Sequence, residues 1–93
     1  MIRVVRLTKK AQKDLDQIPE IIERKLKIWV ALVETESLEA ARKIPGFHDE
    51  PLKGKRAGQR SIRLSRNYRA IYVIKADAIV EFASVEEVNH HDY

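Results

Sequence analysis

The feature that most constrains the fold is a long apolar stripe with helical spacing in the first half of the chain. Its members recur at intervals of three and four residues: Ile18, Ile21, Ile22, Leu26, Trp29, Leu32 and Val33. This spacing places them on one side of an amphipathic helix. Pro19 suits the first turn of that helix, because its missing N–H would be unpaired there in any case.

Shorter patterns predict the remaining elements. Residues 2–7 alternate apolar and basic side chains, as a short strand does. Thr8 is a suitable N-cap for a first helix over residues 9–17, and Ser37 is suitable for a helical turn over 38–43. Three later runs have the alternation or the β-branched and aromatic composition of strands: residues 59–64, 68–74 and 78–85.

This order of elements predicts an α+β fold. An N-terminal strand and a helical hairpin come first, and a three-stranded antiparallel sheet follows, with the helices packed on one face. Residues 45–58 separate the two halves and contain two prolines and three glycines, so we expect most of this stretch to be irregular.

Length and composition limit the classes of protein that are possible. A chain of 93 residues is expected to form a single domain, 1–93. It has no cysteine, which excludes disulfides and thiolate metal sites and is compatible with a reducing cytoplasm. No apolar run approaches the roughly 20 residues that cross a bilayer, so we expect a cytoplasmic protein without a membrane partner.

Basic residues are concentrated in the second half of the chain. Lys and Arg total 18 against 14 Asp and Glu, and no acidic residue occurs between Lys53 and Arg69. Such a patch predicts an anionic partner. Its expected nucleic-acid contacts, besides the strand arginines considered next, are Lys53, Lys55, Arg56, Arg60 and Arg66.

The turn between the strands expected at residues 59–64 and 68–74 fixes where two arginines point. If residues 65–67 form a three-residue loop, Ile62 pairs with Ala70 and Arg63 pairs with Arg69. A shift of one residue would move the apolar side chains off the face that the helices cover, so burial favours this register. Directly opposed like charges destabilise a strand pair by up to ~1 kcal/mol, and such a pair is best tolerated where an anion binds. Alternatively, both arginines extend into solvent or pair with Glu81 on the next strand.

The chain ends in two imidazoles, a carboxylate and a phenol: His90, His91, Asp92 and Tyr93. A ribonuclease that uses no metal must deprotonate a 2′-hydroxyl, stabilise the doubly negative phosphate and protonate the departing 5′-oxygen. Histidine, with an ordinary pKa of ~6.5, suits either proton transfer, and arginine stabilises the phosphate. The candidate catalytic residues are therefore Arg63, Arg69, His90, His91 and Tyr93. The competing interpretation of this ending is a solvated tail.

The other histidine, His48, lies beside Asp49 and Glu50 in the irregular stretch. It is either part of a solvated loop or a second rim of the same cleft. No metal site is expected, since neighbouring side chains on a strand point to opposite faces and the two terminal histidines cannot readily share an ion. No cofactor is expected.

Three segments together resemble the toxins of the RelE/ParE superfamily, from bacterial type II toxin–antitoxin systems. They are Pro51-Leu52-Lys53-Gly54-Lys55-Arg56, Gln59-Arg60-Ser61-Ile62-Arg63-Leu64 and Asn67-Tyr68-Arg69-Ala70-Ile71-Tyr72. They follow the leucine-lysine-glycine, basic-strand and tyrosine-arginine order of the RelE- and HigB-like branches. The preceding strand and helical hairpin also match in order and length, so the likeness extends over nearly the whole chain.

The resemblance implies a ribosome-dependent mRNA endonuclease that cuts in the ribosomal A site and leaves a cyclic phosphate. It assigns phosphate binding to Arg63 and Arg69, maps the loop lysine onto Lys53, and places acid–base chemistry on His90, His91 or Tyr93. It also implies a cognate antitoxin with an amphipathic or partly disordered segment that folds on the toxin. The same fold admits a second function, a ParE-like inhibitor of DNA gyrase without RNase activity, and a third possibility is a catalytically lapsed, antitoxin-binding member.

Two positions depart from the RelE pattern. Glu86-Glu87-Val88 occupies a region where RelE has a further basic residue, and Ser61 stands where RelE has a lysine. Fewer basic residues would therefore hold the phosphate than in RelE, and catalysis would depend more on histidine.

Overall fold

A computed structural model describes residues 1–90 of the chain. Its elements, in chain order, are β1 (Val5–Leu7), α1 (Lys9–Leu15), α2 (Glu20–Glu36), α3 (Leu38–Ala41), the 3-10 turn η1 (Pro45–Phe47), β2 (Glu50–Pro51), the 3-10 turn η2 (Gly54–Arg56), β3 (Arg60–Arg63), β4 (Tyr68–Ala76) and β5 (Glu81–His90). Every predicted helix and strand is present, with shifts of a few residues at the ends. The α+β class is confirmed.

The sheet is larger than the predicted one. It has five strands in the order β1-β5-β4-β3-β2, and β1 runs parallel to β5 while the other neighbours are antiparallel. The three predicted strands β3, β4 and β5 are antiparallel as expected, but the sheet has two more strands, one of which runs parallel to its neighbour. The N-terminal strand adds at one edge, and the two-residue strand β2, inside the stretch expected to be irregular, adds at the other.

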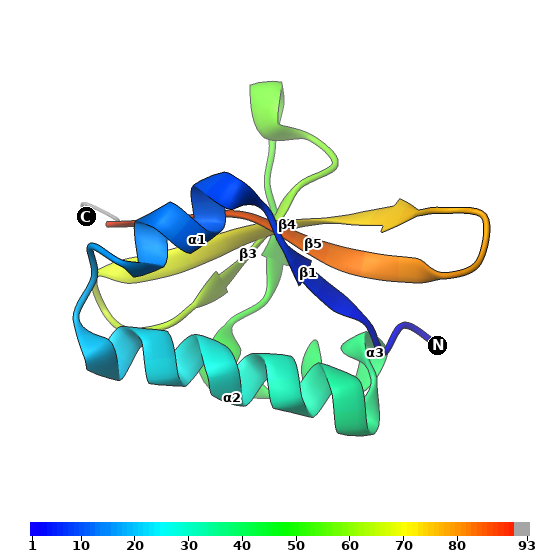
Figure 1. The fold of residues 1–93 in the computed structure, drawn as a ribbon, viewed down its shortest axis with the longest axis horizontal. Coiled ribbons are helices and arrows are strands. Elements are labelled where there is room, and N and C mark those ends of the chain that lie inside the picture. Colours follow the sequence, from blue (N-terminus) through cyan, green and yellow to red (C-terminus); the bar gives the residue numbers. More distant parts are fainter. Residues whose placement is uncertain (91–93) are drawn as a thin grey trace.

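The apolar stripe of α2 forms the core together with one face of the sheet. Figure 1 shows α2 running beneath the sheet, and its inward side chains Ile22, Leu26, Trp29 and Val33 are all buried. Trp29 packs against Tyr72 of β4 with 5.2 Å between ring centroids. Two fully buried aromatic residues of this size contribute several kcal/mol of apolar burial, so this contact ties the helix layer to the centre of the sheet.

The first helix lies along the edge of β5 that β1 leaves uncovered. Thr8 caps α1 by accepting from the N–H of Ala11, and its hydroxyl donates to the carbonyl of Glu86 at 2.9 Å. Further along, the N–H of Val88 donates to the carboxylate of Asp14 at 3.0 Å. These contacts satisfy backbone groups that an open sheet edge would expose to other chains.

The predicted hairpin register is confirmed. Ile62 pairs with Ala70 and Arg63 pairs with Arg69, and both apolar members of the first pair are fully buried. The predicted end of the last strand was wrong, because β5 continues past Val85 to His90. A bulge is the reason: Ile71 pairs with Glu87 but Tyr72 pairs with Val85, so Glu86 is extra.

No helix within residues 1–90 is long and apolar enough to cross a membrane.

Candidate functional site

The face of the sheet turned away from α2 carries two rows of side chains, and we call it the open face. Tyr72 points toward α2, so the alternate residues Arg69 and Ile71 of the same strand point away from it. Directly opposed residues of antiparallel strands share a face. One row is therefore Arg63, Arg69 and Asn89, and the next row is Glu50, Ser61, Ile71 and Glu87.

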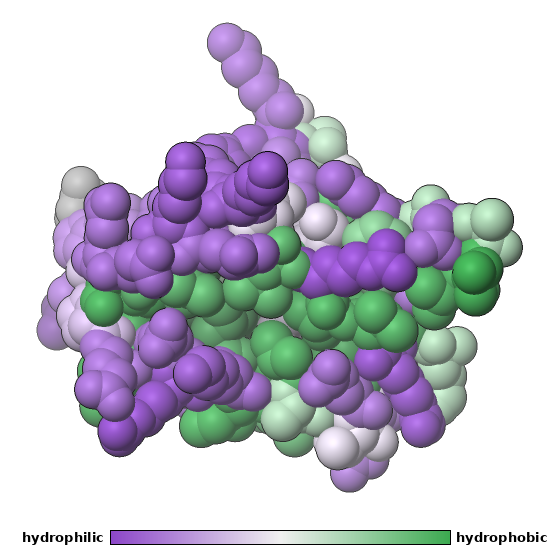
Figure 2. All heavy atoms as spheres, viewed as in Figure 1, coloured by the Kyte–Doolittle hydropathy of each residue, from purple (hydrophilic) through white to green (hydrophobic). Residues whose placement is uncertain are grey.

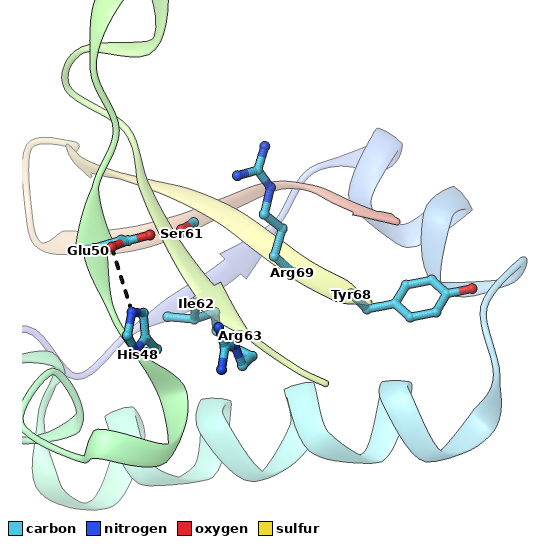
Figure 3. Close-up of a pocket in the computed structure, with 7 residues that line it drawn as sticks. All are labelled: His48, Glu50, Ser61, Ile62, Arg63, Tyr68 and Arg69. Carbon is cyan, nitrogen blue, oxygen red and sulfur yellow. Dashed lines mark ion pairs between the residues drawn. The ribbon is translucent and has the colours of Figure 1, made fainter. Parts of the chain in front are cut away.

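The opposed arginines are the centre of this face. Arg63, at the end of β3, is exposed, and Arg69, on β4, is half-buried. In Figure 3 their guanidinium groups diverge, which relieves the repulsion between two like charges on paired residues. Neither arginine is near Glu81, which pairs with Ala76 at the far end of β4. The two cations thus extend from directly paired residues of one face, and each guanidinium group carries donors that suit phosphate oxygens.

A histidine and a carboxylate border the arginines on the β2 side. His48, Glu50, Arg63 and Arg69 line one shallow cleft, together with Ser61, Ile62 and Tyr68 (Figure 3). His48 Nε2 lies 3.8 Å from Glu50 Oε2, and both side chains are more than half exposed. The sequence left His48 open between a solvated loop and a second rim of the cleft. The lining of this cleft favours the second interpretation.

The segment that carries His48 is attached to the core by a buried polar cluster. The side chain of Asp49 is fully buried and accepts hydrogen bonds from Arg60 Nε at 2.7 Å and from the Tyr72 hydroxyl at 2.6 Å. Arg42 Nε donates to the same hydroxyl at 3.3 Å. We call Asp49, Arg60, Tyr72 and Arg42 the Asp49 cluster.

Burial and hydrogen bonding within the Asp49 cluster shift the pKa values of Tyr72 and Arg60. Burial, and then the hydrogen bond to Asp49, raise the pKa of Tyr72 from 10.0 to about 12. Burial acts to lower the pKa of the Arg60 guanidinium, but its hydrogen bond with Asp49 and the charge of Asp49 outweigh that effect and leave the pKa above its ordinary value. At neutral pH the cluster therefore holds a neutral phenol between charged partners.

A second polar network borders the arginines on the β5 side. Arg56 donates to Glu87 at 3.1 Å and to Gln59 at 2.9 Å, and Asn89 donates to Glu87 at 2.8 Å. Arg69 Nε in turn donates to the Asn89 side-chain oxygen at 3.4 Å. Figure 1 shows the segment with η2 rising on this side of the sheet, opposite α2. Glu87 thus lies in the region where the RelE pattern has a further basic residue, and it holds Arg56 over the open face.

The C-terminal histidine that the structure describes lies on the opposite face. His90 pairs with Tyr68, and their rings meet edge to face at 5.2 Å between centroids. Val88, two residues earlier on the same side of the strand, is buried in the core. A second cleft, on the side of α1, is lined by His90, Tyr68 and Asp14. The structure therefore brings Arg63 and Arg69 together and places His90 across the sheet from them. The predicted catalytic residues His91 and Tyr93 lie outside the described residues.

The other predicted RNA contacts are divided between surface and interior. Lys53, Lys55 and Arg66 are exposed. Arg56 lies over the open face, whereas Arg60 points to the other face and is bound to Asp49. The sequence alone did not separate these roles, because alternate positions of one basic strand contribute to different faces.

The open face carries the guanidinium groups of Arg63 and Arg69, and it is bordered by the imidazole of His48 and the carboxylate of Glu50. Within residues 1–90, no three His, Asp or Glu side chains gather in a group that could hold a metal ion. The chemistry that these groups can perform themselves is anion binding and proton transfer.

Solved structures share this fold. YafQ from E. coli has a TM-score of 0.72 and 18% identity, over 95% of this chain and 92% of that chain. The YoeB/ParE toxin from Agrobacterium tumefaciens has a TM-score of 0.67 and 19% identity, over 96% and 99%. A chain of the toxin–antitoxin complex RelBE2 from Mycobacterium tuberculosis has a TM-score of 0.61 and 26% identity, over 98% and 100%. No protein-family model and no curated protein matches the chain.

Proposed function

From the RelE/ParE-type toxin fold of this chain, we propose that the protein is the toxin of a type II toxin–antitoxin system and cleaves mRNA in the ribosomal A site. In this proposal the reaction needs no metal. A 2′-hydroxyl attacks the adjacent phosphorus, and the products are a cyclic phosphate and a 5′-hydroxyl end.

The observation that carries the proposal is the Arg63–Arg69 pair. The pair puts two guanidinium groups on directly opposed residues of one sheet face. A phosphodiester that lies over both could accept hydrogen bonds from each, because guanidinium groups donate bidentate hydrogen bonds to phosphate oxygens. The same donors stabilise the additional negative charge of the transition state. A protein that acts only by binding a protein target has no need of this pair.

The proposed partner is an antitoxin. Two toxin–antitoxin complexes, DinJ-YafQ and RelBE2, contain a chain of the same fold. Figure 2 shows an apolar band along the middle of the molecule, between the more polar surfaces above and below it. An apolar groove in this region is lined by Leu7, Leu15, Leu26 and Val30, and charged residues such as Glu23 and Lys27 rim it. This composition suits the apolar side of an amphipathic antitoxin helix.

The test is induction of the protein in bacteria, with mapping of mRNA 5′ ends and a gyrase supercoiling assay in parallel. We expect new 5′-hydroxyl ends within translated codons. Arg69→Ala should abolish them, because it removes one of the two guanidinium groups proposed to hold the phosphate. Arg24→Ala is the matched control, since it deletes the same charge from an exposed site on α2.

Two outcomes contradict the proposal. Intact mRNA together with inhibited supercoiling would make the protein a ParE-like gyrase inhibitor. Cleavage that persists at the normal rate in Arg69→Ala would show that the arginine pair has no part in the reaction.

A further inference from the structure

We propose that His48 is the general acid of the open face, the group that protonates the departing 5′-oxygen; this inference rests on the ribonuclease function proposed above. Two histidines lie within the described residues, and only one of them lines the cleft of the arginines. His48 shares that cleft with Arg63 and Arg69. His90 lies on the opposite face, against Tyr68. His48 Nε2 lies 3.8 Å from the carboxylate of Glu50, and Glu50 pairs with Ser61 in the row next to the arginines, so the imidazole borders the face that carries both arginines.

The backbone holds His48 in a conformation that its own side chain does not favour. Its φ and ψ are both 48°, in the left-handed region, where residues other than glycine are uncommon. Such a conformation is unfavourable for a residue with a side chain and persists only where its neighbours enforce it. Here both neighbours are anchored, since Phe47 is 3% exposed and the Asp49 side chain is fully buried. The chain thus turns His48 outward between two residues that are fixed in the interior.

Glu50 is an ion-pair partner of the His48 imidazole. The carboxylate lies 3.8 Å from His48 Nε2, and it pairs across the sheet with Ser61, in the row next to the arginines. A carboxylate within ion-pair distance of an imidazole can fix the orientation of its ring. The protonated imidazole is the form that donates a proton to a leaving group.

The cleft places further charges around the imidazole. Arg63 on β3 and Arg69 on β4 line the same cleft as the imidazole, and so does Glu50 on β2. A phosphodiester held by the arginines would therefore lie in the cleft that the imidazole borders.

The proton balance of the step is complete with water as the only additional participant. The bond from the 2′-oxygen to phosphorus forms and the bond from phosphorus to the 5′-oxygen breaks. The 2′-hydroxyl proton leaves to solvent water, and the proton of His48 moves to the 5′-oxygen. The products are a 2′,3′-cyclic phosphate and a 5′-hydroxyl, and His48 regains a proton from solvent between turnovers.

The experiment uses the full chain and a ribosome complex programmed with an mRNA fragment that the protein cuts at one mapped bond. The variant is His48→Asn, because asparagine also tolerates the left-handed backbone but does not transfer a proton. We expect single-turnover cleavage to fall by about 10²–10⁴-fold, the usual contribution of a general acid. Binding of the programmed complex should be unchanged.

A second substrate carries sulfur in place of the 5′-oxygen at the mapped bond. A thiolate departs without protonation, so His48→Asn should cleave this substrate at close to the wild-type rate. Normal cleavage of the oxygen substrate by His48→Asn would overturn the inference, and so would failure of the sulfur to restore cleavage. If His48→Asn cleaves the oxygen substrate normally and His90→Ala cleaves only the sulfur substrate, the general acid is His90 instead. If the wild-type protein cuts neither substrate, the proposed ribonuclease function itself fails.

Discussion

Replacing Tyr72 with phenylalanine tests whether the Asp49 cluster stabilises the fold as its geometry indicates. The substitution keeps the buried ring against Trp29 and removes only the hydroxyl. That hydroxyl donates to Asp49 at 2.6 Å and accepts from Arg42 at 3.3 Å. A hydrogen bond to a charged group is worth roughly 1.5–3 kcal/mol. We therefore expect Tyr72→Phe to lower the free energy of unfolding by about 2 kcal/mol at pH 7.

The same cluster predicts a pH dependence with a definite sign. The pKa of Tyr72 is raised from 10.0 to about 12, so the folded protein holds the phenolic proton more tightly than the unfolded chain does. Its contribution is fully present below pH 10 and is lost as the pH rises from 10 to about 12. Each unit corresponds to about 1.4 kcal/mol, which gives a loss of about 3 kcal/mol across the window. The stabilities of wild type and Tyr72→Phe should therefore converge above pH 10.

The assay is urea unfolding followed by far-UV circular dichroism at a series of pH values from 7 to about 11.5, chosen to enter the window of the raised pKa. Lysines titrate there as well, but they are common to all the proteins compared. Tyr68→Phe is the matched control, since it removes a phenol from the same strand outside the Asp49 cluster. It should run parallel to wild type. A constant gap between wild type and Tyr72→Phe from pH 7 to 11.5 would refute the coupling of this phenol to the buried carboxylate.

Two further substitutions test whether α1 protects the edge of β5 and whether Arg63 contacts RNA phosphate as proposed. Thr8→Ala removes both the cap of α1 and the hydrogen bond to the Glu86 carbonyl, so it should destabilise the protein by about 1–2 kcal/mol and speed hydrogen exchange in α1 and at residues 85–88; unchanged exchange there would mean that α1 does not protect β5. Arg63→Ala should reduce the slope of log K against log salt for single-stranded RNA by about 0.7, the value for one phosphate contact. Arg24→Ala should leave that slope unchanged, and equal slopes for the two variants would remove Arg63 from the interface.

Local patterns predicted the parts of the fold that depend on which side chains must be buried. The long helix follows from the spacing of Ile22, Leu26 and Trp29 around one stripe. The hairpin register follows from Ile62 and Ala70, because a slip of one residue would exchange the core face for the solvent face. These predictions needed only neighbours in sequence and the requirement of burial.

The parts that failed depend on distant partners. Val5 pairs with Ala83, and nothing near either residue in the sequence indicates this parallel contact. The end of β5 was misplaced for another reason. Glu86 is an extra residue at the bulge, so the core residues Val85 and Val88 are three apart instead of two and the strand alternation breaks.

The sequence predicted the positions of the candidate residues on paired strands, but it left the position of the loop residue His48 undecided. Arg63 and Arg69 were placed together because their strands are paired. His48 was recognised only as a second possible rim, since its position depends on whether Asp49 is solvated or buried. An aspartate between a histidine and a glutamate, in a segment rich in proline and glycine, gives no local sign that its carboxylate enters the core.

The arginines and His48 are held in place by different parts of the fold. Arg63 and Arg69 alternate along β3 and β4 with the buried residues Ile62 and Ala70, so the arginines stay in place for as long as the sheet does. His48 lies between two anchored neighbours, and one of them, Asp49, is fixed by the two hydrogen bonds that its carboxylate accepts. A weakened Asp49 cluster should therefore loosen His48 while the two arginines keep their places. In the ribonuclease proposed here, a folded Tyr72→Phe protein should then bind RNA normally and cleave it slowly. Equal losses of binding and cleavage would instead mean that the loop and the sheet move as one unit.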